Sequence, residues 1–188
     1  MRVTLLCHAV TEGVRRASFG GDDPPTPAGL GDAGSVVVPR ADRALCAPSE
    51  ACRQTAAHLV LDTAGVLDTA VDDRLAGCDY GRWRGRPLDE VRLAEPDALA
   101  EWLADPAAVP HGGESLAALQ ARIGRWLDAQ HGTARAVVAV ADAAVIRAAV
   151  VYAIEASPRS LWRIDVPPLS RAVLVGQPGR WSLRELGR

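Results

Sequence analysis

Two polar residues stand where apolar runs of the sequence end. His8 follows residues 2–7, and Asp142 follows residues 135–141. Both runs have the composition of strands buried in a sheet. In an open parallel sheet, ligands bind in the crevice beyond the carboxyl ends of the strands. We therefore expect His8 and Asp142 to share one functional site, where an imidazole and a carboxylate could carry out acid–base chemistry.

Glu114 and Cys7 could add further chemistry to this crevice. Glu114 opens an amphipathic segment, so it is either a proton donor or an acid that the helix dipole favours in a first turn. Cys7 is either a pocket residue or a small buried hydrophobic side chain, as free cysteine often is. Asp142 has an alternative role too, because it could cap the following helix through a backbone N–H. His8 itself could be structural.

Metal binding is another alternative for the same residues. Cysteine, histidine and carboxylate side chains can ligate zinc or cobalt, so Cys7, His8 and Asp142 could form such a site. However, adjacent residues of a strand point to opposite faces, which would separate Cys7 from His8. We expect no cofactor and keep a zinc or cobalt ion as the alternative.

The composition limits the class of protein. The chain has 188 residues, a formal net charge of −2 and 48% hydrophobic residues, which suits one globular domain over residues 1–188. All 21 basic residues are arginine, and the absence of lysine excludes a Schiff-base lysine and a P-loop lysine. The 4 cysteines form no C-x-x-C pair, which favours free thiols over a zinc site or a disulfide framework.

Charge and hydropathy also limit the partners. The near-neutral balance supplies no field that would hold a nucleic acid. No apolar run approaches the roughly 20 residues of a membrane span, and the first apolar stretch is too short for a signal peptide. We therefore expect a cytoplasmic protein that binds a small molecule, without a nucleic-acid or membrane partner. A homodimer is compatible with the sequence.

Short apolar runs alternate with helical patterns along the chain, which indicates an α/β fold. Strands are predicted over residues 2–7, 42–48 and 135–141, with a closing hairpin over residues 170–175 and 181–186. Helices are predicted over residues 49–59, 114–131 and 143–154. The glycine-containing residues 74–90 are predicted to form an irregular loop with short elements.

Six short motifs resemble, in order and spacing, those of the histidine phosphatase (phosphoglycerate mutase-like) superfamily. They are LLCHAVT at 5–11, PPTPAG at 24–29, APSEACRQTA at 47–56, CDYGRWRG at 78–85, HGGES at 111–115 and VADAAVIR at 140–147. Each motif is weak alone, but together they cover essentially the whole chain. The resemblance implies a three-layer α/β/α sandwich around a mostly parallel central sheet.

The resemblance also implies roles for individual residues. In this family, a histidine after the first strand attacks a phosphoryl group and becomes a phosphohistidine. Two arginines and a second histidine hold the phosphate oxygens, and an acid protonates the leaving oxygen. By position, His8 would be the nucleophile and Glu114 the proton donor. This chain departs from the pattern because Cys7 and Ala51 replace the two arginines and Asp142 replaces the second histidine.

These three replacements predict a weakened phosphate pocket. One arginine on a transferring phosphoryl group can be worth roughly a thousandfold in rate. A carboxylate about 4 Å from a phosphate adds repulsion of roughly 4 kcal/mol per pair of unit charges at an effective dielectric near 20. Cys7 and Ala51 would line the pocket without charge. Arg15 and Arg16, in the segment after the first strand, are candidates to replace the missing guanidinium groups.

Two further residues are candidates for the substrate-binding wall. Trp83 lies in the glycine-containing loop and could cover the site, and His111 could line its mouth.

We interpret the chain as a divergent phosphomonoesterase relative in which His8 and Glu114 remain but classical activity is weak or lost. Two alternatives stay open. The first is an acid–base enzyme in which His8, Glu114 and Asp142 act on an uncharged or cationic small molecule, because the replacements turn an anion site into one that tolerates cations. The second is a pseudoenzyme that binds a metal or another ligand.

Overall fold

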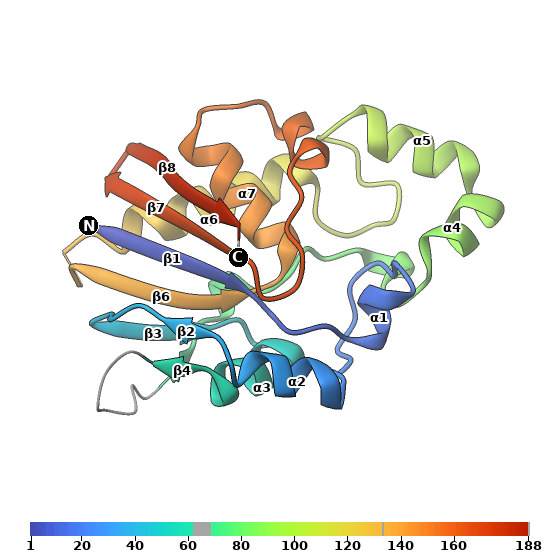
Figure 1. Cartoon of the computed structure of the whole chain (residues 1–188). Coiled ribbons are helices and arrows are strands. Elements are labelled where there is room, and N and C mark those ends of the chain that lie inside the picture. Colours follow the sequence, from blue (N-terminus) through green and yellow to red (C-terminus); the bar gives the residue numbers. More distant parts are fainter. Residues whose placement is uncertain (62–68, 133, 188) are drawn as a thin grey trace.

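A six-stranded sheet forms the centre of the molecule (Figure 1). The computed structural model describes residues 1–61, 69–132 and 134–187. The strand order in the sheet is β5-β3-β6-β1-β7-β8. The strands are β1 (Arg2–Cys7), β3 (Arg43–Cys46), β5 (Thr69–Val71), β6 (Ala136–Ala141), β7 (Arg171–Gln177) and β8 (Arg180–Gly187).

The sheet is mostly parallel, as predicted. β5, β3, β6 and β1 run in one direction, whereas β7 lies antiparallel to β1 and β8 antiparallel to β7. The central strands β1 and β6 are buried along five of their six residues, which fits strands that are covered on both faces. A separate parallel pair is formed by β2 (Val37–Val38) and β4 (Val60–Leu61).

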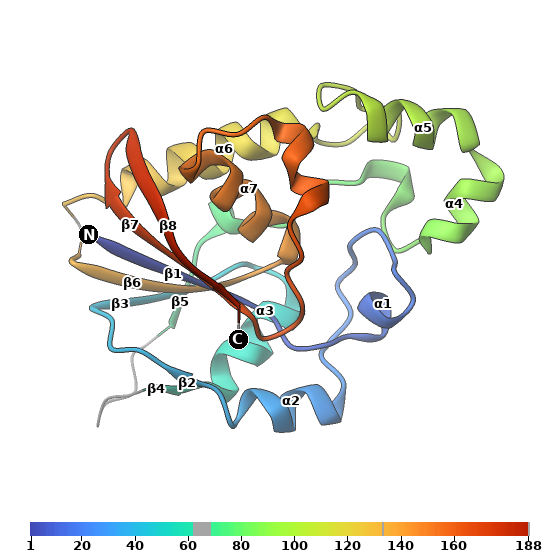
Figure 2. The same ribbon diagram turned by 45° about the horizontal axis from the view of Figure 1, so that its top comes forward.

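Helices cover both faces of the sheet and make three layers (Figures 1 and 2). One face carries α6 (Leu116–Ala129) and α7 (Ala143–Ala153), and the other carries α2 (Pro27–Ala33) and α3 (Glu50–His58). Beyond the carboxyl ends of the parallel strands lie α1 (Glu12–Arg15), α4 (Leu88–Ala94) and α5 (Pro96–Ala104). The 3-10 turns are η1 (Asp73–Leu75), η2 (Gly81–Trp83) and η3 (Pro158–Arg163).

Hydroxyl side chains define where two of the main helices begin. Ser49 Oγ accepts from the Cys52 N–H at 3.4 Å, and Ser115 Oγ accepts from the Ala118 N–H at 3.1 Å. Such caps satisfy backbone donors that the first helical turn leaves free. The helix predicted from Ser49 is therefore confirmed, and Glu114 lies just before its helix rather than inside it.

The region predicted to be an irregular loop, residues 74–90, needs one correction. It contains η1 and η2 as short elements, but its last residues already belong to α4, and α5 follows. Pro87 and Pro96 stand at the starts of these two helices. Proline is a loop signal when it is read alone, yet it is tolerated at the first positions of a helix, where its missing N–H costs nothing.

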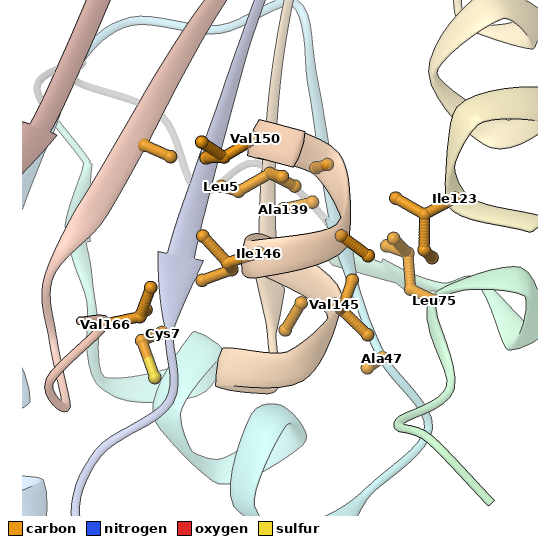
Figure 3. Packing of buried hydrophobic residues seen from close by; sticks show 14 of the residues in the cluster. Leu5, Cys7, Ala47, Leu75, Ile123, Ala139, Val145, Ile146, Val150 and Val166 are labelled. Carbon is orange, nitrogen blue, oxygen red and sulfur yellow. The ribbon is translucent and has the colours of Figure 1, made fainter. Parts of the chain in front are cut away.

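The core lies between α7 and the middle of the sheet (Figure 3). Leu5 on β1, Ala139 on β6, and Ile146 and Val150 on α7 are all buried. Burying one such aliphatic side chain stabilises the fold by about 1.5–3 kcal/mol relative to exposure. This packing fixes the ends of β1 and β6, from which the candidate site is built.

Candidate functional site

The register of β1 and β6 places His8 beside Asp142. Cys7 pairs with Ala141 at the ends of these parallel neighbours, and the next residue of each segment carries the polar side chain. The His8 N–H donates to the Ala141 carbonyl at 3.2 Å. His8 Nε2 lies 3.3 Å from Asp142 Oδ1. The structure thus brings these two predicted site residues into direct contact.

The imidazole of His8 is held in one orientation. The residue is only 7% exposed, and its Nδ1 lies 2.7 Å from the carbonyl oxygen of Ala9. A carbonyl can only accept, so Nδ1 carries a hydrogen and donates it. The Ala9 N–H in turn donates to Thr55 Oγ1 on α3 at 2.9 Å. Nε2 is therefore the ring nitrogen that faces the crevice and Asp142.

The surroundings of His8 favour its protonated form. Burial alone lowers the pKa of His8, but the hydrogen bond with Asp142 and the negative charge of Asp142 outweigh burial, so the pKa of His8 is raised above its ordinary value. Both ring nitrogens of a protonated histidine are donors, and neither has a free lone pair. The form in which both ring nitrogens are donors is therefore favoured at the position where the family resemblance expects a nucleophile.

Asp142 is turned toward this pair and not toward its own helix. It is the N-cap residue of α7, yet its side chain makes no capping hydrogen bond. On its other side the carboxylate meets Gly77, where an added Cβ would lie 2.8 Å from Asp142 Oδ2. The carboxylate is thus confined between the imidazole and the backbone of the segment before η2.

Glu114 is bound by an arginine of α6. Arg122 Nε donates to Glu114 Oε1 at 2.9 Å, and Arg122 Nη2 donates to Glu114 Oε2 at 2.8 Å. The side chain of Glu114 is 17% exposed and that of Arg122 is 25% exposed. Both carboxylate oxygens that would carry a transferable proton therefore already accept hydrogen bonds from one guanidinium group.

The positions of the two replaced arginines are buried and uncharged. Cys7 lies at the end of β1 next to Val166 (Figure 3). Burial, together with the charge of Asp142, raises the pKa of the Cys7 thiol to about 12. Ala51 is 5% exposed in the first turn of α3. A neutral thiol and a methyl group thus occupy these positions.

Arg15 and Arg16 lie at the exposed end of α1. Arg15 Nη1 pairs with Glu12 Oε1 at 3.1 Å, and both side chains are more than half exposed. Over residues 1–61, 69–132 and 134–187, no arginine forms a hydrogen bond or an ion pair with His8 or Asp142. The structure does not bring Arg15 and Arg16 into contact with the pair.

Trp83 and His111 pack against each other inside an aromatic cluster. Their ring centroids lie 5.0 Å apart, and both residues are buried. The cluster consists of Phe19, Tyr80, Trp83, Trp102, His111 and Trp162. His111 Nδ1 accepts from the Gly113 N–H at 3.0 Å, and burial lowers the pKa of His111. Both side chains are therefore packed in the interior, with Trp83 0% and His111 2% exposed.

Sequence reasoning missed Arg122 and Gly77. Arg122 is one of many arginines, and nothing in its local sequence distinguishes it. Gly77 lies in the glycine-containing loop that was noted, but its contact with Asp142 joins residues far apart in the chain. Within the part of the chain that the structure describes, no group of three or more His, Cys, Asp or Glu side chains is placed to hold a metal ion.

Comparison with known proteins shows the family of this chain. Residues 3–188 match the family model of the histidine phosphatase superfamily, branch 1. The chain therefore belongs to the histidine phosphatase superfamily, which confirms the resemblance seen in the six motifs. No helix of the described ranges is long and apolar enough to cross a membrane.

Solved structures share the fold along the whole chain. The alpha-ribazole phosphatase from Shigella flexneri superposes with a TM-score of 0.83 at 20% identity and covers 100% of this chain and 96% of its own. The phosphoserine phosphatase from Entamoeba histolytica in complex with 3-phosphoglyceric acid has a TM-score of 0.81 at 17% identity, with the same coverage of 100% and 96%. At these identities the likeness shows the fold alone.

Curated relatives match over shorter segments. The bifunctional protein Rv2228c of Mycobacterium tuberculosis is 29% identical over 135 residues, which are 68% of this chain and 36% of the relative. Phosphoserine phosphatase 1 of Hydrogenobacter thermophilus is 33% identical over 63 residues, which are 33% of this chain and 30% of the relative. The chain therefore spans about a third of the length of the curated relatives that it matches.

Proposed function

We propose that this chain is a divergent histidine phosphatase in which the phosphohistidine reaction is weak or lost, and that its crevice binds an uncharged or cationic small molecule. The observation that carries the proposal is the contact of 3.3 Å between His8 Nε2 and Asp142 Oδ1. Nδ1 is engaged by the Ala9 carbonyl, so Nε2 is the nitrogen that would have to attack phosphorus.

The protonation of His8 opposes that attack. A nucleophile needs a free electron pair, and a histidine that is protonated beside a carboxylate has none at either nitrogen. Deprotonation would restore the electron pair but would leave Asp142 as an anion in contact with the attacking nitrogen. An incoming phosphate would then meet a like charge at the position where it must be held.

The charge of the crevice supports the same conclusion. Catalysis of phosphoryl transfer depends mainly on positioning and on positive groups around the transferred phosphoryl oxygens. Here Cys7 and Ala51 are neutral, and Asp142 places a carboxylate against His8 where a phosphate would have to be held. A ligand without negative charge suits this site better than a phosphate dianion. A small-molecule ligand and a cytoplasmic location are parts of the same proposal.

Two substrates with one leaving group test the proposal. p-Nitrophenyl phosphate carries a dianion and p-nitrophenyl acetate is neutral, so the same absorbance reports hydrolysis of both. We expect no phosphate hydrolysis above that of the His8→Ala variant, also for a panel of sugar and nucleotide phosphates. Robust phosphatase turnover that His8→Ala abolishes would contradict the proposal.

The geometry favours a second candidate function, proton transfer by the His8–Asp142 pair. Because the Ala9 carbonyl engages Nδ1 and Asp142 engages Nε2, the substrate would have to take the place of Asp142 at Nε2 for the imidazole to act as a general acid or base. Hydrolysis of the neutral ester that is reduced in both His8→Gln and Asp142→Asn would support this function. Equal rates of ester hydrolysis in the parent and in both variants would exclude this function and would support a protein that only binds uncharged or cationic small molecules.

A further inference from the structure

The structure assigns a positioning role to Arg122: we propose that its guanidinium group holds the segment of Gly77 against Asp142 and thereby keeps the Asp142 carboxylate in contact with His8. The inference deepens the proposed function, because it treats the His8–Asp142 pair as the functional group of the crevice. In this proposal Glu114 does not contact the His8–Asp142 pair and affects it only by holding Arg122 in place. The positioning role rests on four hydrogen bonds of Arg122, on the close approach of Gly77 to Asp142 and on the contact of Asp142 with His8.

Arg122 on α6 binds two other parts of the chain. Its Nε and Nη2 bind both oxygens of Glu114, just before α6. Its Nη1 donates to the carbonyl of Arg74 at 2.7 Å, and its Nη2 also donates to the carbonyl of Gly77 at 3.3 Å. The planar guanidinium fork makes these bonds in fixed directions. One residue of α6 therefore ties Glu114 to the carbonyls of residues 74 and 77.

Gly77 passes this constraint to Asp142. An added Cβ at Gly77 would lie 2.8 Å from Asp142 Oδ2 and 3.3 Å from its Cγ. The backbone of Gly77 therefore forms the wall behind the carboxylate and limits its rotation away from the imidazole. With Oδ2 against this wall, Oδ1 lies 3.3 Å from His8 Nε2.

The pair responds to this placement because two opposing effects act on His8. Burial lowers the pKa of His8, and the contact with Asp142 raises it. If the carboxylate moves away, burial remains and the pKa of His8 falls. A small displacement of the Gly77 segment would therefore change the pKa of His8.

The direction in which the pKa of His8 moves in Arg122 variants distinguishes a positioning role from a simple charge effect. Replacing Arg122 by a neutral residue removes a positive charge near the crevice and leaves Glu114 unpaired, which by electrostatics alone would raise the pKa of His8. Loss of positioning lowers it. Arg122→Lys keeps the charge but lacks the fork that binds Glu114 and two carbonyls, so a charge effect predicts no change for this variant.

The experiment is a titration of His8 by NMR. The 4 histidines of the chain are assigned by single His→Gln variants, and the pKa of His8 is compared in the parent, Arg122→Lys, Arg122→Gln and Asp142→Asn. We expect the pKa of His8 to fall in all three variants. Arg86→Lys is the matched control, since Arg86 also binds two carboxylates, those of Glu90 and Glu95, but has no hydrogen bond to residue 77. It should leave the pKa of His8 unchanged.

Two further measurements keep the test decisive if an Arg122 variant folds poorly. Gly77→Ala leaves Arg122 intact and presses the carboxylate from behind toward the imidazole, so it should raise the pKa of His8, opposite to the Arg122 variants. Gly31→Ala on α2, where an added Cβ meets nothing within 4 Å, should leave the pKa of His8 unchanged. In the Asp142→Asn background, Arg122→Lys should cause no further change.

An unchanged pKa of His8 in folded Arg122→Lys and in Gly77→Ala would overturn the positioning role. The positioning role would also be overturned if Arg122→Lys lowered the pKa of His8 as much in the Asp142→Asn background as it does in the parent. Neither outcome bears on the proposed function, which the hydrolysis of p-nitrophenyl phosphate tests separately.

Discussion

The imidazole of His8 and the carboxylate of Asp142 form a contact of 3.3 Å at the carboxyl ends of β1 and β6. The pair stands where the family resemblance expects two histidines that act on a phosphoryl group. A carboxylate at one of these positions changes both the charge of the site and the protonation of the remaining histidine.

The pair makes stability depend on pH in a defined direction. The pKa of His8 is raised in the folded state, so its contribution is fully present below the ordinary histidine value of about 6.5 and is lost as the pH rises through the raised value. The loss of unfolding free energy caused by Asp142→Asn should therefore be largest near pH 6 and should shrink toward pH 9. Urea unfolding across this range measures it; a loss that grows with pH would contradict the protonated pair.

Restoring positive charge should restore phosphatase activity. The double variant Ala51→Arg, Asp142→His returns a guanidinium group and a second imidazole to the crevice. One such arginine can be worth roughly a thousandfold in rate, so p-nitrophenyl phosphate hydrolysis should rise by at least about a hundredfold over the parent. The same double variant on a His8→Ala background should remain inactive, and activity there would show that His8 is not the nucleophile.

Two glycines on helices should respond oppositely to alanine. Gly124 on α6 packs against Tyr152, whose ring would lie 2.5 Å from an added Cβ, whereas an added Cβ at Gly31 on α2 meets nothing within 4 Å. Overpacking costs about 1–3 kcal/mol, while alanine is favoured over glycine inside a helix by roughly 0.5–1 kcal/mol. Thermal or urea unfolding should therefore show that Gly124→Ala destabilises the fold and Gly31→Ala does not.

The four thiols should react slowly while the protein is folded. All four are free and buried. Burial raises the pKa of Cys7 and of Cys78 to about 12, and it also raises the pKa of Cys46 and of Cys52. Because the thiolate is the reactive form, a disulfide reagent at pH 8 should label few thiols until denaturant is added and then all 4. Rapid labelling of the native chain would contradict this burial.

The sequence alone was enough to predict the fold class. Two mostly apolar runs, residues 2–7 and 135–141, predicted buried parallel strands, and the order of six motifs predicted the family and three layers of structure. These signals are local or depend only on order along the chain, so they can be recognised without the tertiary structure. The polar residues after the two runs also indicated that His8 and Asp142 would meet. The helices α4 and α5 were missed, since the prolines at their starts are also loop signals.

Only the tertiary structure decided what these residues do to one another. Whether His8 is protonated depends on the balance between burial and one carboxylate at 3.3 Å, and neither quantity is encoded in the residue types. Whether Glu114 is free depends on Arg122, eight positions further on, whose long side chain could have pointed to many partners. The contact of Gly77 with Asp142 joins distant segments through backbone packing. The pKa of His8 and the partner of Glu114 depend on distances between residues that are far apart in the sequence. The same residues at other distances would leave His8 neutral and Glu114 unpaired.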